Sequence, residues 1–496
     1  MSKITVNATF ATTSGIYNIY NVSAVSGTSL PSWVTSQLSG GSLPSQGLYV
    51  SWSGSTTNAL SFINNYTNST TFKIAYSGTQ FSNLSATNIT VSQLWNAGQY
   101  HSIAKHSPNN PPISGMLSLS PGPWGGDGGN GIDLTNAGSN LTELWVFNDT
   151  YCATSGNSTR VNPSSRFIRN CIAVQSGSAS NDLSLNSFTY YFGGTAANPT
   201  SFINPTSDYN GWASHYWLNG GGFCINPTST YIFALPRASA ITSTSGTFQA
   251  EHGYRTEVFW VNNVTADPNT WNFSGINWPW GQSGNGGMSP SLGSQFIDLG
   301  DGYITGTMSI GTGFGVGLFR TPKSDLDATL INLPTFMRTE FYMGPNLGWI
   351  KANALQNSTD LGQIPSVVPP IYEGFGFFSS DITGSFVKLT DRTVLFEMGT
   401  LAPAGSNPCL NYRASTSLSG TWGSQVPLYS PNTINNGKTP GGSTLWTYMA
   451  YAHPTQTWTG QSTNDVLLTF STNITSGSTT GDTSSYWVDV LRITGL

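Results

Sequence analysis

The 496-residue sequence predicts an all-β protein, a five-bladed β-propeller preceded by a small β-sandwich-like N-terminal domain. Three observations favour this fold class. Short runs rich in Val, Ile, Thr, Tyr, Phe and Trp alternate with turns of Gly, Asn, Asp and Ser, as strands do. Charged residues make up only 8% of the chain, and the Glu and Lys that long helices need are scarce. Similar pairs of strands recur about every 80 residues along most of the chain.

The N-terminal domain is predicted at residues 1–100. Segments such as 4–10 and 71–76 alternate apolar and polar residues with the period of two that is typical of half-buried strands. A proline-rich stretch then predicts a linker at residues 101–120. The remaining residues, 121–496, carry the repeats and are assigned to the propeller.

Each repeat combines a strand that ends in a turn, a second strong strand and at least one further strand. The second strands begin at Leu144, Tyr231, Tyr303, Val394 and Val466. Five such antiparallel units fit five blades, because a closed ring leaves only short, protected strand edges. The last strand, from Tyr486, is expected to complete a blade by pairing near the start of the chain. The irregular spacing keeps a series of β-sandwiches as the alternative.

The charge balance excludes several classes of protein. A net charge of −5 without a cluster of Lys or Arg lacks the electrostatic footprint of a nucleic-acid binder. No run of about 18 apolar residues occurs, so we expect no membrane insertion. Five His and four Cys leave little material for a metal site, and we expect neither a metal nor a cofactor. The motifs of serine hydrolases and P-loop NTPases are absent.

Sequons for N-glycosylation point to an extracellular or cell-surface protein. Their number in this chain argues for a glycosylated surface. The N-terminus shows no apolar segment typical of a signal peptide, so this prediction rests on composition. The predicted glycosylation sites are Asn7, Asn21, Asn65, Asn68, Asn83, Asn88, Asn140, Asn148, Asn157, Asn263, Asn272, Asn357 and Asn473.

The four cysteines form an even count, which fits an oxidising compartment. Cys152 and Cys171 flank a predicted hairpin, and we expect a disulfide between them, with buried free thiols as the alternative. The pairing of Cys224 and Cys409 stays open.

Three carboxylates are the predicted catalytic residues. Asp127 lies between glycine pairs ahead of the first blade's strong strand, where small neighbours let a ligand approach, although the same pattern also makes a tight turn. Asp149 ends that strand and either faces the channel or caps backbone amides in a turn. Glu373, among aromatic residues at the predicted start of the fourth blade, is suited to general-acid work, with pairing to an arginine as the alternative.

Four further residues are predicted to bind substrate. Trp124 and Trp217 lie in loops rich in Gly and Asn and can stack on sugar rings, although most of the 16 Trp are expected in blade cores. His453 precedes a proline at the turn of the fifth blade, where a structural role is the alternative. Arg413 is expected to hold a sugar hydroxyl or to pair with a carboxylate.

Several motifs of the predicted propeller carry a family resemblance. They are Trp124-Gly-Gly-Asp-Gly, Leu144-Trp-Val-Phe-Asn-Asp-Thr, Phe167-Ile-Arg-Asn-Cys-Ile-Ala-Val-Gln, Trp217-Leu-Asn-Gly-Gly-Gly-Phe and Tyr448-Met-Ala-Tyr-Ala-His-Pro. These motifs resemble a secreted five-bladed propeller family, formerly a domain of unknown function, which includes bacterial endo-acting D-arabinanases. The resemblance covers about residues 115–496 and no part of the N-terminal domain.

The resemblance implies a five-bladed propeller that hydrolyses or binds glycans. It places Asp127 and Asp149 at the family's acidic positions in the first blade and His453 at its His-Pro position. One departure is that the usual Gly-Asp-Thr is Asn148-Asp149-Thr150 here. A glycan on Asn148 would crowd a channel-facing Asp149, so glycosylation of Asn148 and a catalytic Asp149 conflict.

The leading hypothesis is a secreted glycoside hydrolase that cleaves a polysaccharide such as an arabinan-like polymer. Asp127 would act as base or nucleophile and Glu373 or Asp149 as acid, because hydrolysis of a glycosidic bond needs one ionised and one protonated carboxyl group. The alternative is a non-catalytic glycan-binding or surface-structural glycoprotein, such as an extracellular assembly subunit, since the sequons and low charge fit it as well. In both cases the expected partner is a polysaccharide or glycan, and self-assembly stays open.

Overall fold

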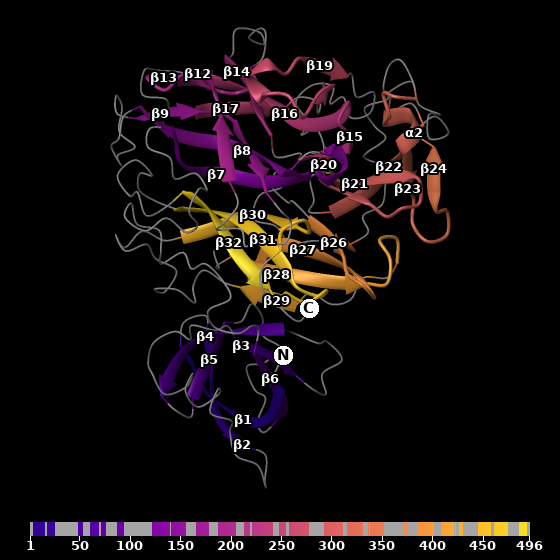
Figure 1. Cartoon of the computed structure of the whole chain (residues 1–496). Helices are drawn as coiled ribbons and strands as arrows, with labels where there is room; N and C mark the ends of the chain where they lie inside the picture. The colour runs from indigo at the N-terminus through magenta and orange to yellow at the C-terminus, as the bar shows by residue number, and fades with distance from the viewer. Residues whose placement is uncertain are drawn as a thin grey trace.

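The computed structural model is almost entirely β, as predicted (Figure 1). In the strands before residue 93, and in parts of several later strands, it describes only the backbone. The described residues are 3–14, 17–24, 48–52, 60–68, 71–75, 87–93, 122–138, 140–154, 165–177, 187–204, 213–218, 221–241, 248–253, 257–276, 292–310, 315–330, 336, 338–351, 372–373, 385–400, 408–420, 422, 426–429, 445–457, 461–474 and 486–493.

The N-terminal strands form a small all-β unit, and they close into a barrel. The strands are β1 (Lys3–Ser14), β2 (Tyr17–Ala24), β3 (Leu48–Trp52), β4 (Leu60–Asn68), β5 (Thr71–Ala75) and β6 (Thr87–Gln93). Their order is β1-β2-β5-β4-β3-β6, and β1 also pairs with β6. Pairing of the first strand with the last distinguishes this barrel from the expected sandwich of two sheets, and it removes exposed sheet edges. The predicted linker, residues 101–120, lies outside the described residues.

The rest of the chain forms consecutive antiparallel sheets in a propeller-like arrangement, which we number in chain order. The first sheet holds β7 (Gly122–Asp133), β8 (Leu141–Ala153), β9 (Ser165–Ile168), β10 (Cys171–Ser176) and β11 (Ser187–Tyr191). The second holds β14 (Ala213–Trp217), β15 (Gly222–Asn226), β16 (Ser229–Ile241), β17 (Phe248–Gly253), β18 (Glu257–Val261) and β19 (Phe273–Ile276).

The later sheets follow the same plan. The third holds β20 (Leu292–Asp298), β21 (Tyr303–Ile310), β22 (Gly315–Pro322), β23 (Glu340–Tyr342), β24 (Trp349–Lys351) and β25 (Tyr372–Glu373). The fourth holds β26 (Ser385–Lys388), β27 (Thr393–Thr400), β28 (Pro408–Ser415) and β29 (Val426–Tyr429). The fifth holds β30 (Leu445–His453), β31 (Val466–Ile474) and β32 (Trp487–Ile493).

Short elements complete the described part of the chain. They are the β12 (Gly193–Thr195) and β13 (Asn198–Thr200) ribbon, the 3-10 turns η3 (Thr135–Ala137) and η5 (Pro268–Thr270), and helix α2 (Lys323–Leu326). None of the helices in the described ranges is long and apolar enough to cross a membrane.

The innermost strands of the sheets close a ring. β7 contacts β15, β15 contacts β20, β20 contacts β26, β26 contacts β30, and β30 returns to β7. The final strand, β32, completes the fifth sheet by pairing with β31 and also contacts β7. The contact between the first and fifth sheets, which we call the seam, therefore joins the beginning of this ring to its end.

The hydrophobic core lies between neighbouring sheets, because each sheet is buried on both faces. Trp145 and Phe147 of the first sheet pack with Leu467 and Val488 of the fifth, across the seam. Other clusters join the first sheet to the second, the second to the third, and the third to the fourth. The predicted propeller fold is confirmed by this arrangement.

Truncation at the seam is expected to destabilise the propeller. Leu467 is 1% exposed in the core cluster of the seam. Leu467→Ala should lower the free energy of unfolding by about 2–5 kcal/mol, because it leaves a cavity that the neighbouring sheets cannot fill. Urea denaturation measures the change. Leu347→Ala is the control, since Leu347 is 63% exposed, and its effect should stay within about 0.5 kcal/mol.

Candidate functional site

The pairing of β7 with β8 separates the candidate carboxylates into two groups. Gly126 lies opposite Thr150, so Asp127 and Asp149 lie close together near the middle of the hairpin; we call this part, with the strand ends beyond it at Gly122 and Ala153, the Asp127 end. Asp133 lies opposite Glu143 at the other end, which we call the cavity end. Asp133 lies six positions beyond Asp127 in β7, which is at most roughly 20 Å at the usual rise per residue.

Asp127 is buried and held by two phenols from the other side of the seam. The Tyr448 hydroxyl donates to Asp127 Oδ2 at 2.6 Å, and the Tyr486 hydroxyl donates to the same oxygen at 3.0 Å. Burial, followed by the nearby Asp127 carboxylate, holds the pKa of the Tyr486 phenol well above its usual value. The phenol therefore stays a neutral donor, and donors to a carboxylate favour its ionised form. Asp127 is thus suited to act as a base or nucleophile.

The backbone around Asp127 departs from regular strand geometry on both sides of the seam. The β7–β8 register shifts three times between Pro123 and Asn130, and β30 has a further shift between Tyr448 and Tyr451. Met449 and Tyr486 have positive φ, 55° and 64°. A non-glycine residue with positive φ costs about 1–3 kcal/mol, and such strain concentrates at functional sites. Bulges likewise redirect side chains next to active sites.

Glycine is required beside Asp127. Gly128 has a φ of 89°, and a Cβ there would lie 2.9 Å from the backbone nitrogen of Asn148. Its N–H donates to Ser471 Oγ at 3.0 Å, which ties β7 to β31. The glycine pairs that flank Asp127 in the sequence therefore allow both the bulges and the close approach of the fifth sheet.

Asp149 is bound by residues of the first and second sheets. Arg169 Nη1 lies 3.1 Å from both carboxylate oxygens, and Trp217 Nε1 donates to Oδ1 at 3.3 Å. An ion pair favours the charged form of a carboxylate. Asp149 is therefore suited to electrostatic stabilisation and positioning more than to proton donation. Trp217 lies beside a candidate carboxylate, at the end of β14.

Asn148 does not fit its predicted role as a glycosylation site. The side chain is 2% exposed, and its Nδ2 group contacts Met449 Sδ at 3.6 Å across the seam. A buried amide has no room for a glycan, so this prediction is wrong, and the conflict between a glycan and Asp149 disappears. Asn140, Asn263 and Asn272 are exposed, and Asn473 is half-buried. The remaining sequons have side chains outside the described residues.

The prediction that Glu373 opens the fourth blade is wrong. Glu373 belongs to β25, which pairs with Gly315 of β22 in the third sheet. β20 runs toward the cavity end, and β21, antiparallel to it, runs back toward the Asp127 end. β22 is antiparallel to β21, so its first residue, Gly315, lies at the Asp127 end. Two strands, β21 and β22, separate Glu373 from the inner strand β20. The side chains of Glu373 and Trp124 lie outside the described residues.

His453 and Arg413 lie at the cavity end, away from Asp127. His453 is 0% exposed, with Nδ1 2.7 Å from Glu143 Oε1 and its ring stacked 4.2 Å from that of Trp145. A side chain without exposed surface cannot contact a bound substrate, so the predicted substrate-binding role of His453 is wrong. Its hydrogen bond and ring contact fit the alternative, a structural role. Arg413 lies two residues before the end of β28, in the third strand of the fourth sheet, opposite Leu395. This position is remote from the Asp127 end.

The hydrogen bonds of His453 determine how many protons the buried pair holds. The Thr469 hydroxyl donates to the Gly129 carbonyl at 2.8 Å, so His453 Nε2, 2.8 Å from the same hydroxyl, must donate to it. The contact between Nδ1 and Glu143 then needs a second proton. The pair is therefore either imidazolium with carboxylate or neutral imidazole with carboxylic acid, and has no net charge in either form. Gln456 also donates to Glu143 Oε2.

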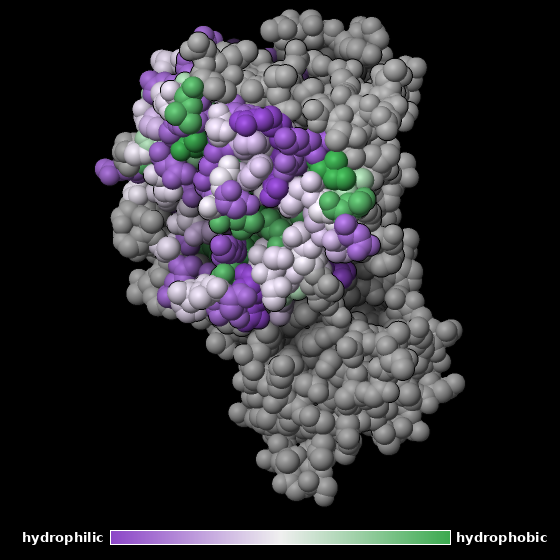
Figure 2. Space-filling view, turned by 90° about the vertical axis from the view of Figure 1, so that its right-hand side faces the viewer, coloured by the Kyte–Doolittle hydropathy of each residue, from purple (hydrophilic) through white to green (hydrophobic). Residues whose placement is uncertain are grey.

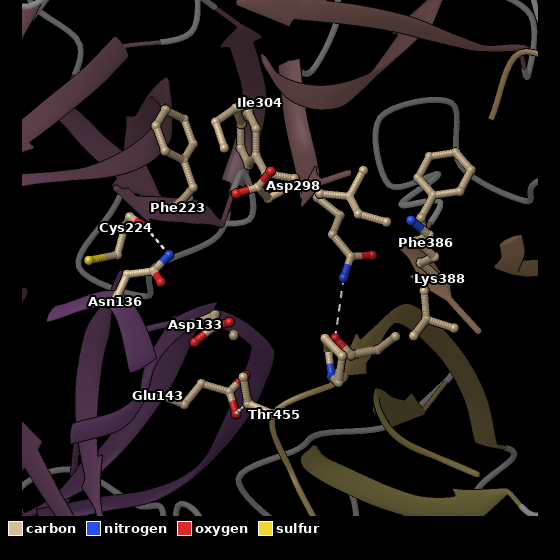
Figure 3. Close-up of a pocket in the computed structure, with 18 residues that line it drawn as sticks. Asp133, Asn136, Glu143, Phe223, Cys224, Asp298, Ile304, Phe386, Lys388 and Thr455 are labelled. Atoms are coloured by element: carbon tan, nitrogen blue, oxygen red, sulfur yellow. Dashed lines mark hydrogen bonds between the residues drawn. The ribbon is translucent and has the colours of Figure 1, made fainter. Parts of the chain in front are cut away.

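A cavity of about 230 Å³ lies at the cavity end, bounded by the inner strands of the ring (Figure 3). Asp133 and Glu143 lie together on one side of it, with Asp298 and Lys388 across the space. The propeller face in Figure 2 is hollowed near its middle, with apolar surface inside and polar surface around it. None of the predicted catalytic residues lines this cavity. Within the described ranges, no group of three His, Cys, Asp or Glu side chains is placed to hold a metal ion.

The predicted disulfide is not formed. Cys152 and Cys171 are buried free thiols, and Cys152 lies opposite Arg166 while Cys171 lies opposite Phe147. The register thus separates the two cysteines along β8, although both flank the hairpin in sequence. Burial raises the pKa of the Cys171 thiol to about 12 and also raises that of Cys152, so neither is a reactive thiolate at neutral pH.

Tyr448, Tyr486 and Arg169 were not among the residues predicted from the sequence. The tyrosines lie more than 300 residues from Asp127, and nothing local in their segments indicates a carboxylate partner. Two of the three, Tyr448 and Arg169, lie within the motifs that carry the family resemblance, which is the one signal that could have identified them.

The comparisons with known proteins show the fold. No protein-family model and no curated protein matches the chain. A candidate hydrolase from Bacteroides ovatus is 15% identical with a TM-score of 0.52, over 76% of this chain and 87% of that one. An α-L-arabinanase from Cellvibrio cellulosa in complex with arabinohexaose is 12% identical with a TM-score of 0.33, over 71% and 89%. An α-L-arabinofuranosidase from Lactobacillus brevis is 10% identical with a TM-score of 0.33, over 65% and 86%.

The raised pKa of Asp133 predicts that this residue lowers the stability of the fold at neutral pH. Burial, opposed by hydrogen bonds from Thr135 and supplemented by repulsion from Glu143, raises the pKa of Asp133. A carboxyl group whose pKa is raised by folding destabilises the fold once pH exceeds its unfolded value near 4. Asp133→Asn should therefore raise Tm at pH 7, and the gain should vanish near pH 3.

The matched control for this variant is Asp327→Asn, measured by the same thermal unfolding at both pH values. Burial of Asp327 is outweighed by hydrogen bonds from Thr329 and Asn226, which together lower its pKa. Its ionised form therefore stabilises the fold, and Asp327→Asn should lower Tm at pH 7. An Asp133→Asn variant whose Tm falls as well would contradict a raised pKa of Asp133 in the folded protein.

Proposed function

We propose that the chain is a secreted glycoside hydrolase that cleaves a polysaccharide, such as an arabinan-like polymer, at the Asp127 end. The observation that carries this proposal is the buried Asp127 carboxylate, held through one oxygen by Tyr448 and Tyr486 where strained backbone meets three bulges of β7. A protein maintains strain of this kind where it fixes a reacting group. The sequence motifs around Asp127, Asp149 and Tyr448 support the same activity through their family resemblance.

The site residues take different roles in this proposal. Asp127 acts as base or nucleophile, because the two phenols favour its charged form. Asp149, paired with Arg169, stabilises positive charge that develops on the sugar ring in the transition state. Glu373 is the proposed proton donor, since its strand ends on the same side of the propeller as Asp127. Trp124 and Trp217 are the proposed sugar contacts.

A binding protein without catalysis is the second candidate. The observation that favours it is the ion pair between Asp149 and Arg169, which commits one of the two nearby carboxylates to an arginine. In that case the Asp127 end would hold a glycan through hydrogen bonds and aromatic contacts only.

Secretion, glycosylation and a count of five blades belong to the same proposal. The exposed sequons at Asn140, Asn263 and Asn272 support a glycosylated exterior. The closed ring of inner strands, from β7 through β15, β20 and β26 to β30, supports five blades.

Replacement of the Asp127 carboxylate tests the proposal. Asp127→Asn should reduce hydrolysis of arabinan by at least about 100-fold, because the amide cannot act as base or nucleophile yet still accepts a hydrogen bond. Release of reducing sugar from a panel of polysaccharides that includes arabinan measures the rate. Asp391→Asn is the control, since Asp391 pairs only with the adjacent Arg392 at the surface among its described contacts.

The outcomes separate the two candidates. A wild-type protein that binds a member of the panel and releases no sugar from any would establish the binding protein. Unchanged turnover in Asp127→Asn would remove Asp127 from the mechanism.

A further inference from the structure

Phe167 is an aromatic side chain left exposed beside the Asp127 end. It is 41% exposed, and the other exposed large apolar side chains of the described residues are Leu330 and Leu347. Phe167 lies in β9, opposite Tyr151 of β8, and Tyr151 is two residues beyond Asp149 in the same strand. An exposed aromatic ring is informative where it adjoins a polar site, because it offers a ligand an apolar face.

A chain of ring contacts connects Phe167 to the catalytic carboxylate. The Phe167 ring centroid lies 4.9 Å from that of Tyr151, and Tyr151 lies 5.8 Å from Tyr486 in an edge-to-face contact. Tyr486 donates in turn to Asp127. The exposed ring is therefore linked, through Tyr151, to one of the two tyrosines that hold Asp127.

Polar groups beside Phe167 are balanced in charge. The Arg169 guanidinium carbon lies 5.0 Å from the Phe167 ring centroid, and the same guanidinium is paired with Asp149. Trp217 also contacts Asp149, with Nε1 3.3 Å from its carboxylate. Because the positive and negative charges cancel, the surface favours an uncharged ligand that combines hydroxyl groups with an apolar face.

We propose that Tyr151, Phe167 and Arg169 form a sugar-binding subsite, which holds a neutral sugar ring of the substrate chain next to the ring at Asp127. The C–H face of the sugar packs on Phe167 and Tyr151, while Arg169 and Asp149 exchange hydrogen bonds with its hydroxyls. This subsite rests on the proposed function and deepens it, since it requires a polymer or oligomer rather than a monosaccharide. One exposed aromatic residue beside an ion pair is too small a surface for a stable protein partner.

Phe167→Ala tests the subsite through the kinetics of arabinan hydrolysis. The KM for arabinan should rise about fivefold, because the exposed part of one aromatic ring loses its burial against substrate, while kcat should change less than twofold. The rise should be smaller for p-nitrophenyl arabinofuranoside, which carries a single sugar ring. Leu347→Ala is the matched control, because it removes an exposed apolar side chain in the turn between β23 and β24 and should leave KM unchanged.

Each outcome supports or overturns the subsite. Equal KM values for Phe167→Ala and Leu347→Ala, with an active wild type, would overturn it and leave the hydrolase proposal intact. A loss of self-association in sedimentation, with KM unchanged, would assign Phe167 to a protein contact instead. If the wild type hydrolyses nothing, affinity electrophoresis in arabinan gels tests whether the subsite binds the polymer. Retardation that Phe167→Ala weakens would retain the subsite without the hydrolase, and no retardation of the wild type would overturn both.

Discussion

Closure of the ring between its first and fifth sheets is the constraint on which the rest of the structure depends. An open set of sheets would expose the faces of β7 and β31, whereas contact across the seam buries Trp145 and Phe147 against Leu467 and Val488. Two polar clusters cross the same seam, one near the middle of β7 and one at its cavity end. Asp127 meets the fifth sheet through Tyr448 and Tyr486, and Glu143 meets it through His453.

The candidate site follows from this closure. Residues more than 300 positions apart meet only when the ring is complete, so Asp127 acquires its phenol donors as a consequence of folding the last sheet. The positive φ values at Met449 and Tyr486 cost energy that packing of the surrounding sheets must offset. At the other end of β7, the Glu143–His453 pair keeps a buried contact without net charge, which avoids the larger cost of an isolated buried ion. Stability and the proposed chemistry therefore depend on the same interface.

Local sequence pattern predicted the parts of this site that local structure determines. Glycine-rich turns and strand ends in the sequence single out Asp127, Asp149 and Trp217 as candidates, and hairpin pairing of β7 with β8 brings the two carboxylates close together. Long-range geometry was not predictable. The tyrosines that hold Asp127 come from another sheet. The strand register separates Cys152 from Cys171. Asn148 satisfies the sequon pattern, although its side chain is buried at the seam. Glu373 was placed in the wrong sheet because a strand of two residues has no pattern of its own.

In the proposed mechanism, phenols of the fifth sheet keep Asp127 ionised for catalysis. The most direct measurement is the pH profile of kcat/KM for arabinan hydrolysis in a protein with both Tyr448→Phe and Tyr486→Phe, compared with wild type. Loss of both donors should raise the pKa of the catalytic carboxylate and move the acid limb of the profile to higher pH, with the fold retained by circular dichroism. An acid limb at the wild-type position in the folded, active double variant would contradict the claim.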